Sequence, residues 1–376
     1  MQDTDPRPAS PSSQAIADWI RLVEAPGVGC RTARVLLDAF GSPAAVLRAG
    51  RAALAAHVPS ATAAALCAPP SADTARQLDA TLAWLAQPHH HLLTLHAPDY
   101  PEALRHIPDP PLLLYLKGRR ALLQEPMIAI VGSRNASTQG CANAANFARA
   151  LSDAGLCVVS GMALGIDTAA HEGALQGAGS TLAVIGTGID RVYPARNRAL
   201  AHRIAEDGCI VSEYALGTPP VANNFPRRNR IISGMAAGVL VVEAAAQSGS
   251  LITAQMAAEQ GREVFALPGS IHSALAKGCH QLIREGARLV ETVDEVLEGM
   301  RMSPLVRTHA PVVGTIEAGD DALLAALGHD PVEPDALLER VGGDAAALAG
   351  ELLALELAGL VERLPGGRVQ RVVRAA

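Results

Sequence analysis

The chain has 376 residues, with 31 Lys and Arg against 37 Asp and Glu, which gives a formal net charge of −6. Apolar residues make up 49% and charged residues 18%, a balance that excludes a disordered chain and is enough for two or three packed domains. Only Lys117 and Lys277 are lysines, and neither stands in a Gly-x4-Gly-Lys-Ser/Thr segment, so a P-loop nucleotide hydrolase is excluded.

Neither the N-terminal segment nor the cysteines indicate export. Residues 1–13 are rich in Pro and Ser and have no apolar core, so we expect a disordered tail there and no signal peptide. The longest apolar run, 236–246, is shorter than the about 20 residues that span a bilayer. The six cysteines are scattered singly, which favours reduced core thiols over a metal site or disulfides. We expect a cytoplasmic protein without membrane insertion, metal or cofactor.

Residues 14–97 are rich in Ala and Leu at helical spacing, which predicts a small all-helical domain similar to SAM or helix-hairpin-helix domains. Its turn Pro26-Gly27-Val28-Gly29-Cys30 is typical of a helix-hairpin-helix, in which glycine amides meet a DNA phosphate. A plain turn between two helices of a bundle explains the same pattern, and both interpretations stay open. The histidines at 89–91 are interpreted as loop residues.

Residues 98–300 alternate short apolar runs with helical stretches, which predicts an α/β fold with a Rossmann-like, doubly wound, mainly parallel sheet. The expected strands are Met127–Val131, Leu156–Val159, Thr181–Ile185, Cys209–Val211, Val239–Val242 and Val264–Leu267.

Residues 301–319 are rich in Pro, Gly and Thr, as in a linker, and residues 320–376 predict a small C-terminal winged-helix domain. Its three expected helices are Asp321–Leu327, Pro334–Val341 and Asp344–Ala358, followed by a hairpin whose strands flank Pro365-Gly366-Gly367. From position 301 onward there are 7 Arg and 11 acidic residues, a charge of −4. Because domains that read DNA are usually basic, we expect this domain to bind a protein or merely to pack against the rest of the chain.

Three turns that follow expected strands have the composition of anion-binding sites, because backbone amides and hydroxyls at a helix N-terminus attract negative charge. Their candidate residues are Gly132, Ser133 and Arg134 after the first run, Gly161 and Gly165 after the second, and Ser248, Gly249, Ser250 and Thr253 after the fifth. The order Gly132-Ser133-Arg134-Asn135 departs from Gly-x-Gly-x-x-Gly, which disfavours a dinucleotide enzyme.

Two further clusters carry polar chemistry. Asp167 and His171 lie one helical turn apart, and a helix cap with a hydrogen-bonded histidine is favoured over an acid–base pair, since no nucleophile or metal motif is nearby. The run from Phe225 to Ile232 contains the densest basic cluster and one of only four phenylalanines. Arginines bind phosphate and an aromatic ring stacks on a base, which together suit single-stranded nucleic acid.

With these motifs the chain resembles the DNA-processing protein A (DprA/Smf) family of bacterial recombination and natural transformation. The resemblance covers about half of the chain and rests on many ordered motifs. They are Asp99-Tyr100-Pro101, Pro111–Tyr115, Ile130–Arg134, Ser160–Asp167 with His171, Tyr193-Pro194, Ser212-Glu213-Tyr214, Phe225–Ile232, Val242-Glu243-Ala244, Ser248–Thr253 and Pro268-Gly269.

The resemblance implies a non-catalytic homodimer that binds single-stranded DNA and helps to load RecA onto strands coated by single-strand-binding protein. It implies DNA contacts at Arg134, Phe225, Arg228, Asn229 and Arg230, to which we add Lys277. The family usually has Asn at the position of His280, so a polar contact there is expected to differ.

Two other functions are weighed against this one. A nucleotide-processing hydrolase of a related Rossmann family would need a carboxylate soon after Ser248–Thr253, but the next acid is Glu259. A protein-bridging adaptor would fail to bind single-stranded DNA at low salt.

Overall fold

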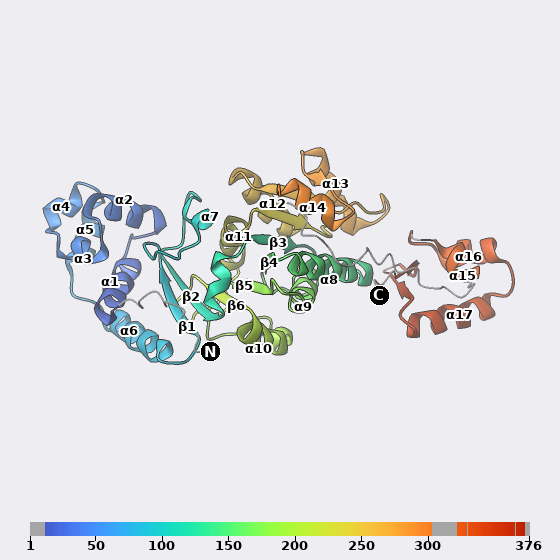
Figure 1. Ribbon diagram of the computed structural model, residues 1–376, viewed down its shortest axis with the longest axis horizontal. Helices are drawn as coiled ribbons and strands as arrows, with labels where there is room; N and C mark the ends of the chain where they lie inside the picture. The colour runs from blue at the N-terminus through green and yellow to red at the C-terminus, as the bar shows by residue number, and fades with distance from the viewer. Residues whose placement is uncertain (1–11, 303–321, 329, 365, 373–376) are drawn as a thin grey trace, which may run out of the picture.

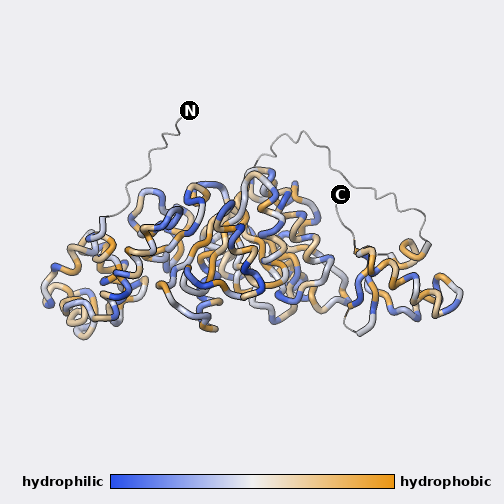
Figure 2. The backbone as a smooth tube through the Cα atoms, turned by 90° about the horizontal axis from the view of Figure 1, so that it is seen from below, coloured by the Kyte–Doolittle hydropathy of each residue, from blue (hydrophilic) through white to orange (hydrophobic). Residues whose placement is uncertain are grey.

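The structure is a computed structural model that describes residues 12–302, 322–328, 330–364 and 366–372. Three bodies follow one another along the long axis in chain order: a helical N-terminal domain, a central α/β domain and a small C-terminal domain (Figure 1). A view turned by 90° shows the same row, with apolar segments gathered inside the central body (Figure 2). The tail at 1–13 and the linker at 301–319 lie almost wholly outside the described residues.

The N-terminal domain consists of six helices that pack around apolar side chains such as Trp19, Leu22 and Leu36. Ser42 and Ser71 are the N-cap residues of two of these helices, because each hydroxyl accepts a hydrogen bond from a first-turn amide. The helices are α1 (Ser13–Glu24), α2 (Cys30–Phe40), α3 (Pro43–Arg48), α4 (Arg51–Ala55), α5 (Ser60–Cys67) and α6 (Ala72–Leu85).

The central domain contains a nine-stranded sheet in the order β1-β2-β6-β5-β4-β3-β7-β8-β9. From β6 to β9 all neighbours are parallel, whereas β2 is antiparallel to β6 and to β1. The strands are β1 (His90–Thr94), β2 (Leu113–Gly118), β3 (Met127–Val131), β4 (Cys157–Ser160), β5 (Thr181–Ile185), β6 (Cys209–Ser212), β7 (Gly238–Val241), β8 (Glu263–Ala266) and β9 (Arg288–Leu289). The predicted extended Rossmann-like sheet is confirmed.

Helices cover both faces of this sheet, and the central strands are buried on both sides. Alternate residues of one strand enter separate cores: Ile128 and Ile130 face α8 and α9, whereas Ala129 and Val131 enter the core on the other face. The helices are α7 (Glu102–Arg105), α8 (Thr138–Asp153), α9 (Ile166–Ala174), α10 (Arg198–Asp207), α11 (Asn224–Met235), α12 (Gly249–Glu259), α13 (Lys277–Arg284) and α14 (Val293–Gly299). None of the helices in the described ranges is both long and apolar enough to cross a bilayer.

The expectation that the histidines at 89–91 lie in a loop is wrong for two of them. His90 and His91 belong to β1, which pairs with β2 at the end of the sheet. The ring of His90 is buried and stacks on Trp84, with 4.2 Å between ring centroids, and its Nδ1 lies 2.9 Å from the Trp84 carbonyl. The stacking on Trp84 and the contact with its carbonyl, both made to α6, compensate the polar His90 ring for the loss of water.

The C-terminal domain has the predicted winged-helix composition of three helices and a hairpin. Its elements are α15 (Ala322–Leu327), α16 (Pro334–Val341), α17 (Ala345–Leu357), β10 (Val361–Arg363) and β11 (Val369–Arg371). Apolar side chains from all five, including Leu337, Leu352 and Val369, form a core of their own.

Candidate functional site

The carboxyl ends of the parallel strands form the edge at which an open α/β sheet binds its ligands. The predicted turns after β3 and β4 meet there, because the backbone of Gly165 lies directly against the carbonyls of Ser133 and Arg134. The amide of Ile166 also donates a 3.1 Å hydrogen bond to the Ser133 carbonyl. The two glycine-rich turns therefore form one continuous surface.

Three exposed or half-buried side chains cluster on this surface. The Arg134 guanidinium lies 5.9 Å from the centroid of the Phe225 ring, and the Tyr193 ring lies 5.4 Å from Phe225 with the ring planes tilted by 43°. Phe225 also packs on Gly186 after β5, where an added Cβ would lie 3.1 Å from its ring. Tyr193 is 47% exposed, and no ion pair involves Arg134 among the described residues. A cation and two aromatic rings are thus open to a planar anionic guest.

Arg228, predicted as a DNA contact, is buried below this surface. One guanidinium nitrogen, Nη1, donates to the Gly161 carbonyl at 2.6 Å and to the Val184 carbonyl, so the side chain joins the ends of β4 and β5. Burial lowers its pKa to about 10, although Asp167 acts in the opposite direction. An added Cβ at Gly161 would overlap the guanidinium, so a larger residue there would have to displace the Arg228 side chain.

Asp167 and His171 both hold structure in place and do not bond to each other. The Asp167 carboxylate accepts hydrogen bonds from the amides of Gly161 (3.1 Å) and Ala163 (3.2 Å), and burial raises its pKa. The Thr181 hydroxyl donates to the Val158 carbonyl, so it accepts from His171 Nδ1 at 2.7 Å. Burial lowers the pKa of His171 to about 3, which keeps the ring neutral. The predicted hydrogen-bonded histidine is confirmed. The predicted helix cap is wrong, because α9 has Gly165 at its N-cap with no side-chain cap, and Asp167 bonds instead to amides of the turn before the helix.

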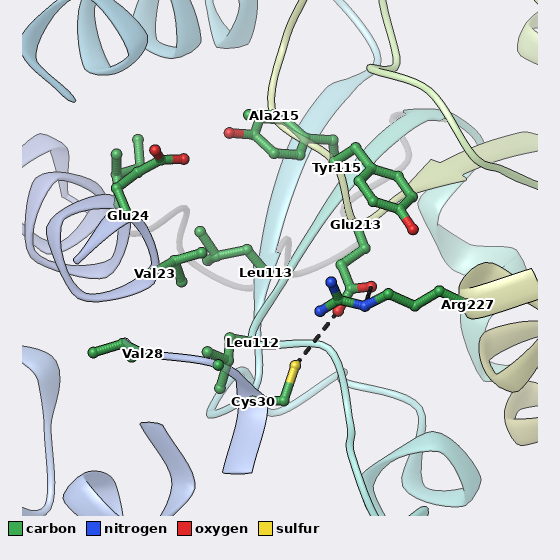
Figure 3. A pocket seen from close by; sticks show the side chains of 13 residues that line it. Val23, Glu24, Val28, Cys30, Leu112, Leu113, Tyr115, Glu213, Ala215 and Arg227 are labelled. Atoms are coloured by element: carbon green, nitrogen blue, oxygen red, sulfur yellow. Dashed lines mark hydrogen bonds and ion pairs between the residues drawn. The ribbon is translucent and has the colours of Figure 1, made fainter. Parts of the chain in front are cut away.

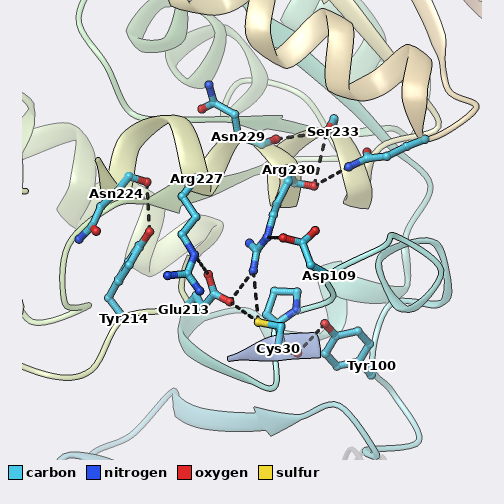
Figure 4. A network of polar contacts seen from close by, with 12 residues as sticks. Cys30, Tyr100, Asp109, Glu213, Tyr214, Asn224, Arg227, Asn229, Arg230 and Ser233 are labelled. Atoms are coloured by element: carbon cyan, nitrogen blue, oxygen red, sulfur yellow. Dashed lines mark hydrogen bonds and ion pairs between the residues drawn. The ribbon is translucent and has the colours of Figure 1, made fainter. Parts of the chain in front are cut away.

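Arg230 turns away from the strand-end surface, toward the N-terminal domain. Its guanidinium bonds to Glu213 at 2.5 Å and to Asp109 at 2.9 Å, and it lies 3.8 Å from the Cys30 sulfur at the start of α2 (Figure 4). Although burial opposes the charged form, the Glu213 carboxylate raises the pKa of Arg230. The glycine turn before α2 is therefore part of an interdomain contact.

A cavity of about 290 Å³ lies between the two domains next to this network. Val23, Glu24 and Val28 line it from the N-terminal domain, opposite Leu113 and Arg227 of the central domain (Figure 3). It does not include the exposed cluster at the strand ends.

The N-terminus of α8, the predicted anion site after β3, already has ligands from the chain itself. Glu243, after β7, accepts hydrogen bonds from the Ser137 amide (2.9 Å) and hydroxyl (2.6 Å). Ser137 in turn caps α8 by accepting from the Gly140 amide at 2.9 Å. The amides of Thr138 and Gln139 donate to Glu362, a residue of the winged-helix domain.

The remaining predicted residues lie around α11, α12 and α13. Asn229 is half-buried and its carbonyl accepts from Ser233 at 3.2 Å. Ser248 caps α12, with its hydroxyl 2.7 Å from that of Ser250, while Gly249 is exposed and Thr253 is buried. Within the described part of the chain, no hydrogen bond joins these hydroxyls to Arg134.

Two residues of α13 were singled out from the sequence. Lys277 is exposed and its amine donates to the Ile271 carbonyl, while His280 Nε2 lies 3.0 Å from the Gly269 carbonyl. Across the described residues, no three His, Cys, Asp or Glu side chains are placed to hold a metal ion.

Two residues of this region were not predicted as site residues. Tyr193 was visible as a Tyr-Pro step in a chain with four tyrosines, a signal that resembles the Phe225-Pro226 step. Glu362 had no local signal, because its role depends on how two domains pack.

Comparisons with known proteins identify the family of the chain. A family model described as "DNA recombination-mediator protein A" matches residues 91–301, and one described as "DprA winged helix domain" matches residues 309–367. Protein Smf of Escherichia coli is 41% identical over 303 residues, which is 78% of this chain and 81% of that protein.

Two solved structures have the same fold. The chain superposes on the X-ray structure of DNA processing protein A from Streptococcus pneumoniae with a TM-score of 0.66 and 36% identity, covering 77% of this chain and 98% of that one. A Helicobacter pylori DNA processing protein A, described for its single-stranded DNA binding mode, gives a TM-score of 0.52 and 30% identity over 57% of this chain and 97% of that one. The chain therefore belongs to the DNA recombination-mediator protein A (DprA/Smf) family, and its role is that of a DNA-processing recombination mediator.

Proposed function

We propose that this chain binds single-stranded DNA at the carboxyl ends of β3, β4 and β5, with Arg134, Phe225 and Tyr193 as direct contacts. The observation that carries the proposal is the cluster of the exposed Arg134 guanidinium and Tyr193 ring around the half-buried Phe225 ring. Such a cluster suits a single strand, because an unpaired base can lie on a ring while the adjacent phosphate meets the arginine. The ssDNA-binding relative from Helicobacter pylori supports the same ligand class.

In this proposal the buried arginines act through other groups. Arg228 holds the turns after β4 and β5 in position, and Arg230 holds the N-terminal domain. Gly132, Ser133 and Gly165 shape the turn that presents Arg134. The outer approach of the strand is lined by Asn229, Ser248, Gly249 and Lys277, which are exposed or half-buried, whereas Ser250 and Thr253 are buried in α12.

We propose that binding involves no bond cleavage. His171 and Asp167, the acid–base candidates of the turn after β4 and of α9, are both buried and hydrogen-bonded to the fold. A cytoplasmic homodimer that presents single-stranded DNA coated by single-strand-binding protein to RecA fits a binder of this kind. The dimer, RecA and single-strand-binding protein belong to the proposal as partners.

The test is the affinity of the purified full chain for a fluorescent oligo-dT, measured by anisotropy over a range of salt. Arg134→Gln removes one proposed phosphate contact, so it should weaken binding and lower the slope of log K against log salt by about 0.7. Phe225→Ala should weaken binding by about 1–3 kcal/mol with little change of slope, because stacking is not ionic.

The matched control is Arg203→Gln on α10, which removes an equally exposed arginine away from the strand ends. It should leave both quantities close to those of the parent chain. Equal affinities of the parent, Arg134→Gln and Arg203→Gln at every salt concentration would refute the assignment of the site.

A further inference from the structure

The winged-helix domain touches the central domain through an acidic side chain. Glu362, on β10, places Oε2 2.8 Å from the amide nitrogen of Thr138 and Oε1 3.3 Å from that of Gln139. One carboxylate thus binds the first two amides of α8 in a forked arrangement.

The Glu362 carboxylate lies at the positive end of the α8 helix dipole. The first amides of a helix have no partner within the helix and carry its positive dipole end. α8 has 16 residues, and its third amide, of Gly140, is already bound by the Ser137 hydroxyl. Glu362 therefore adds a second negative charge to a helix end that already has the Glu243 carboxylate at Ser137, and it does so in the place where such ends bind phosphate.

The contact lies beside the proposed DNA site. Arg134 precedes Thr138 by four residues on the turn between β3 and α8, so a strand bound at Arg134 brings its phosphates close to the same amides. The domain that contributes Glu362 comes from a region with a charge of −4 after position 300. Its acidity, unusual for a domain that would read DNA, suits a partner that occupies an anion site.

A second region of the same domain faces the central body without close packing. An open hollow of about 410 Å³ separates Ser270 and His272 from Pro331 and Arg340. Since the domain has its own core, it can leave this position without unfolding.

We infer that the N-terminus of α8 is a shared anion site, occupied by Glu362 in the free chain and by a backbone phosphate when single-stranded DNA binds. The winged-helix domain is then an acidic competitor that DNA displaces. This inference rests on the proposed function, because it needs a strand at Arg134.

The experiment compares Glu362→Gln with Glu351→Gln in the full chain. Glu351 is exposed on α17, so its variant removes the same charge from the same domain without touching α8. Oligo-dT affinity is measured at low salt, and amide hydrogen exchange is followed at Thr138 and Gln139 without DNA. Glu362→Arg serves as a second variant, since it replaces attraction to the helix end by repulsion.

Glu362→Gln should bind oligo-dT about 2- to 5-fold more tightly than the parent, which is the range expected for losing a charged ligand of a helix end. Exchange at the two amides should accelerate in Glu362→Gln and Glu362→Arg and stay unchanged in Glu351→Gln. Unchanged affinity of the Glu362→Gln chain for oligo-dT would overturn the inference, and so would unchanged exchange at the two amides in both Glu362 variants.

The two proposals fail in different ways. If the parent chain does not bind oligo-dT, the proposed function fails, and the exchange data still report whether Glu362 holds α8. If the parent binds but Glu362→Gln binds no more tightly, the DNA site stands and the competition is rejected.

Discussion

Gly165 is a position where one added methyl group should directly damage the proposed DNA site. It precedes α9 with φ of +75° and ψ of −124°, a backbone region that residues with a Cβ strongly avoid. An added Cβ would also overlap the Ser133 carbonyl oxygen and lie 2.7 Å from that of Arg134. Gly165→Ala should therefore strain the backbone and push the Arg134 turn outward.

The two effects can be given magnitudes. The backbone strain costs about 1–3 kcal/mol, and the steric overlap with a backbone that must shift costs about 1–3 kcal/mol more. A total of about 4 kcal/mol, the middle of the summed range, lowers the melting temperature by about 8–16 °C for a domain of about 200 residues. Oligo-dT affinity should fall as well, because Arg134 moves relative to Phe225.

Gly261 offers the matched control. It has φ of +70°, but nothing lies within 4 Å of an added Cβ. Gly261→Ala should cost about 1 kcal/mol and leave oligo-dT binding unchanged, because it shares the positive φ and lacks the overlap. The melting temperature and the oligo-dT affinity of both variants are compared by thermal unfolding and fluorescence anisotropy. If Gly165→Ala were no less stable than Gly261→Ala and bound DNA as the parent does, the packing argument would be refuted.

Two further predictions follow from buried groups. His171 has a pKa of about 3 in the folded chain against 6.5 when exposed, so between these pH values the unfolded chain binds more protons and stability falls as the pH is lowered. Urea unfolding of His171→Gln at several pH values should therefore give a plot of unfolding free energy against pH whose slope is smaller by up to one proton. Arg228→Gln should lose about 3 kcal/mol of stability, since the guanidinium bonds the Gly161 and Val184 carbonyls. It should also weaken oligo-dT binding without changing the slope of log K against log salt. A reduced slope would instead indicate a direct phosphate contact.

The central sheet was predictable because its strands are buried on both faces. Continuous apolar runs then mark strand and turn boundaries, and the runs Met127–Val131 and Thr181–Ile185 coincide with β3 and β5 residue for residue. The antiparallel end of the sheet was not predictable in this way. β1 begins with His90 and His91, and its place depends on Trp84 and on pairing with β2, both of which are tertiary contacts.

The site was predictable where a motif directly follows a strand. The turns at Gly132 and Gly161 lie at strand ends because the chain must leave the sheet there, and parallel order brings them to one edge. Which side chains reach the surface was not predictable, because that depends on the rotation of each helix about its axis. Phe225 and Tyr193 meet although 32 positions separate them, and no local pattern encodes that contact.

The arginines around α11 illustrate why counting charges is a poor guide to binding a polyanion in an acidic chain. Arg227 and Arg230, three residues apart on one side of the helix, both face Glu213, whereas Arg228 points the other way into the strand ends. Each of these cations therefore already has an oxygen partner. Among the described residues no ion pair involves Arg134, a lone arginine in its turn, so its charge remains for a phosphate. The densest basic cluster thus holds the domains and loops together, and the cation best suited to bind DNA lies outside it.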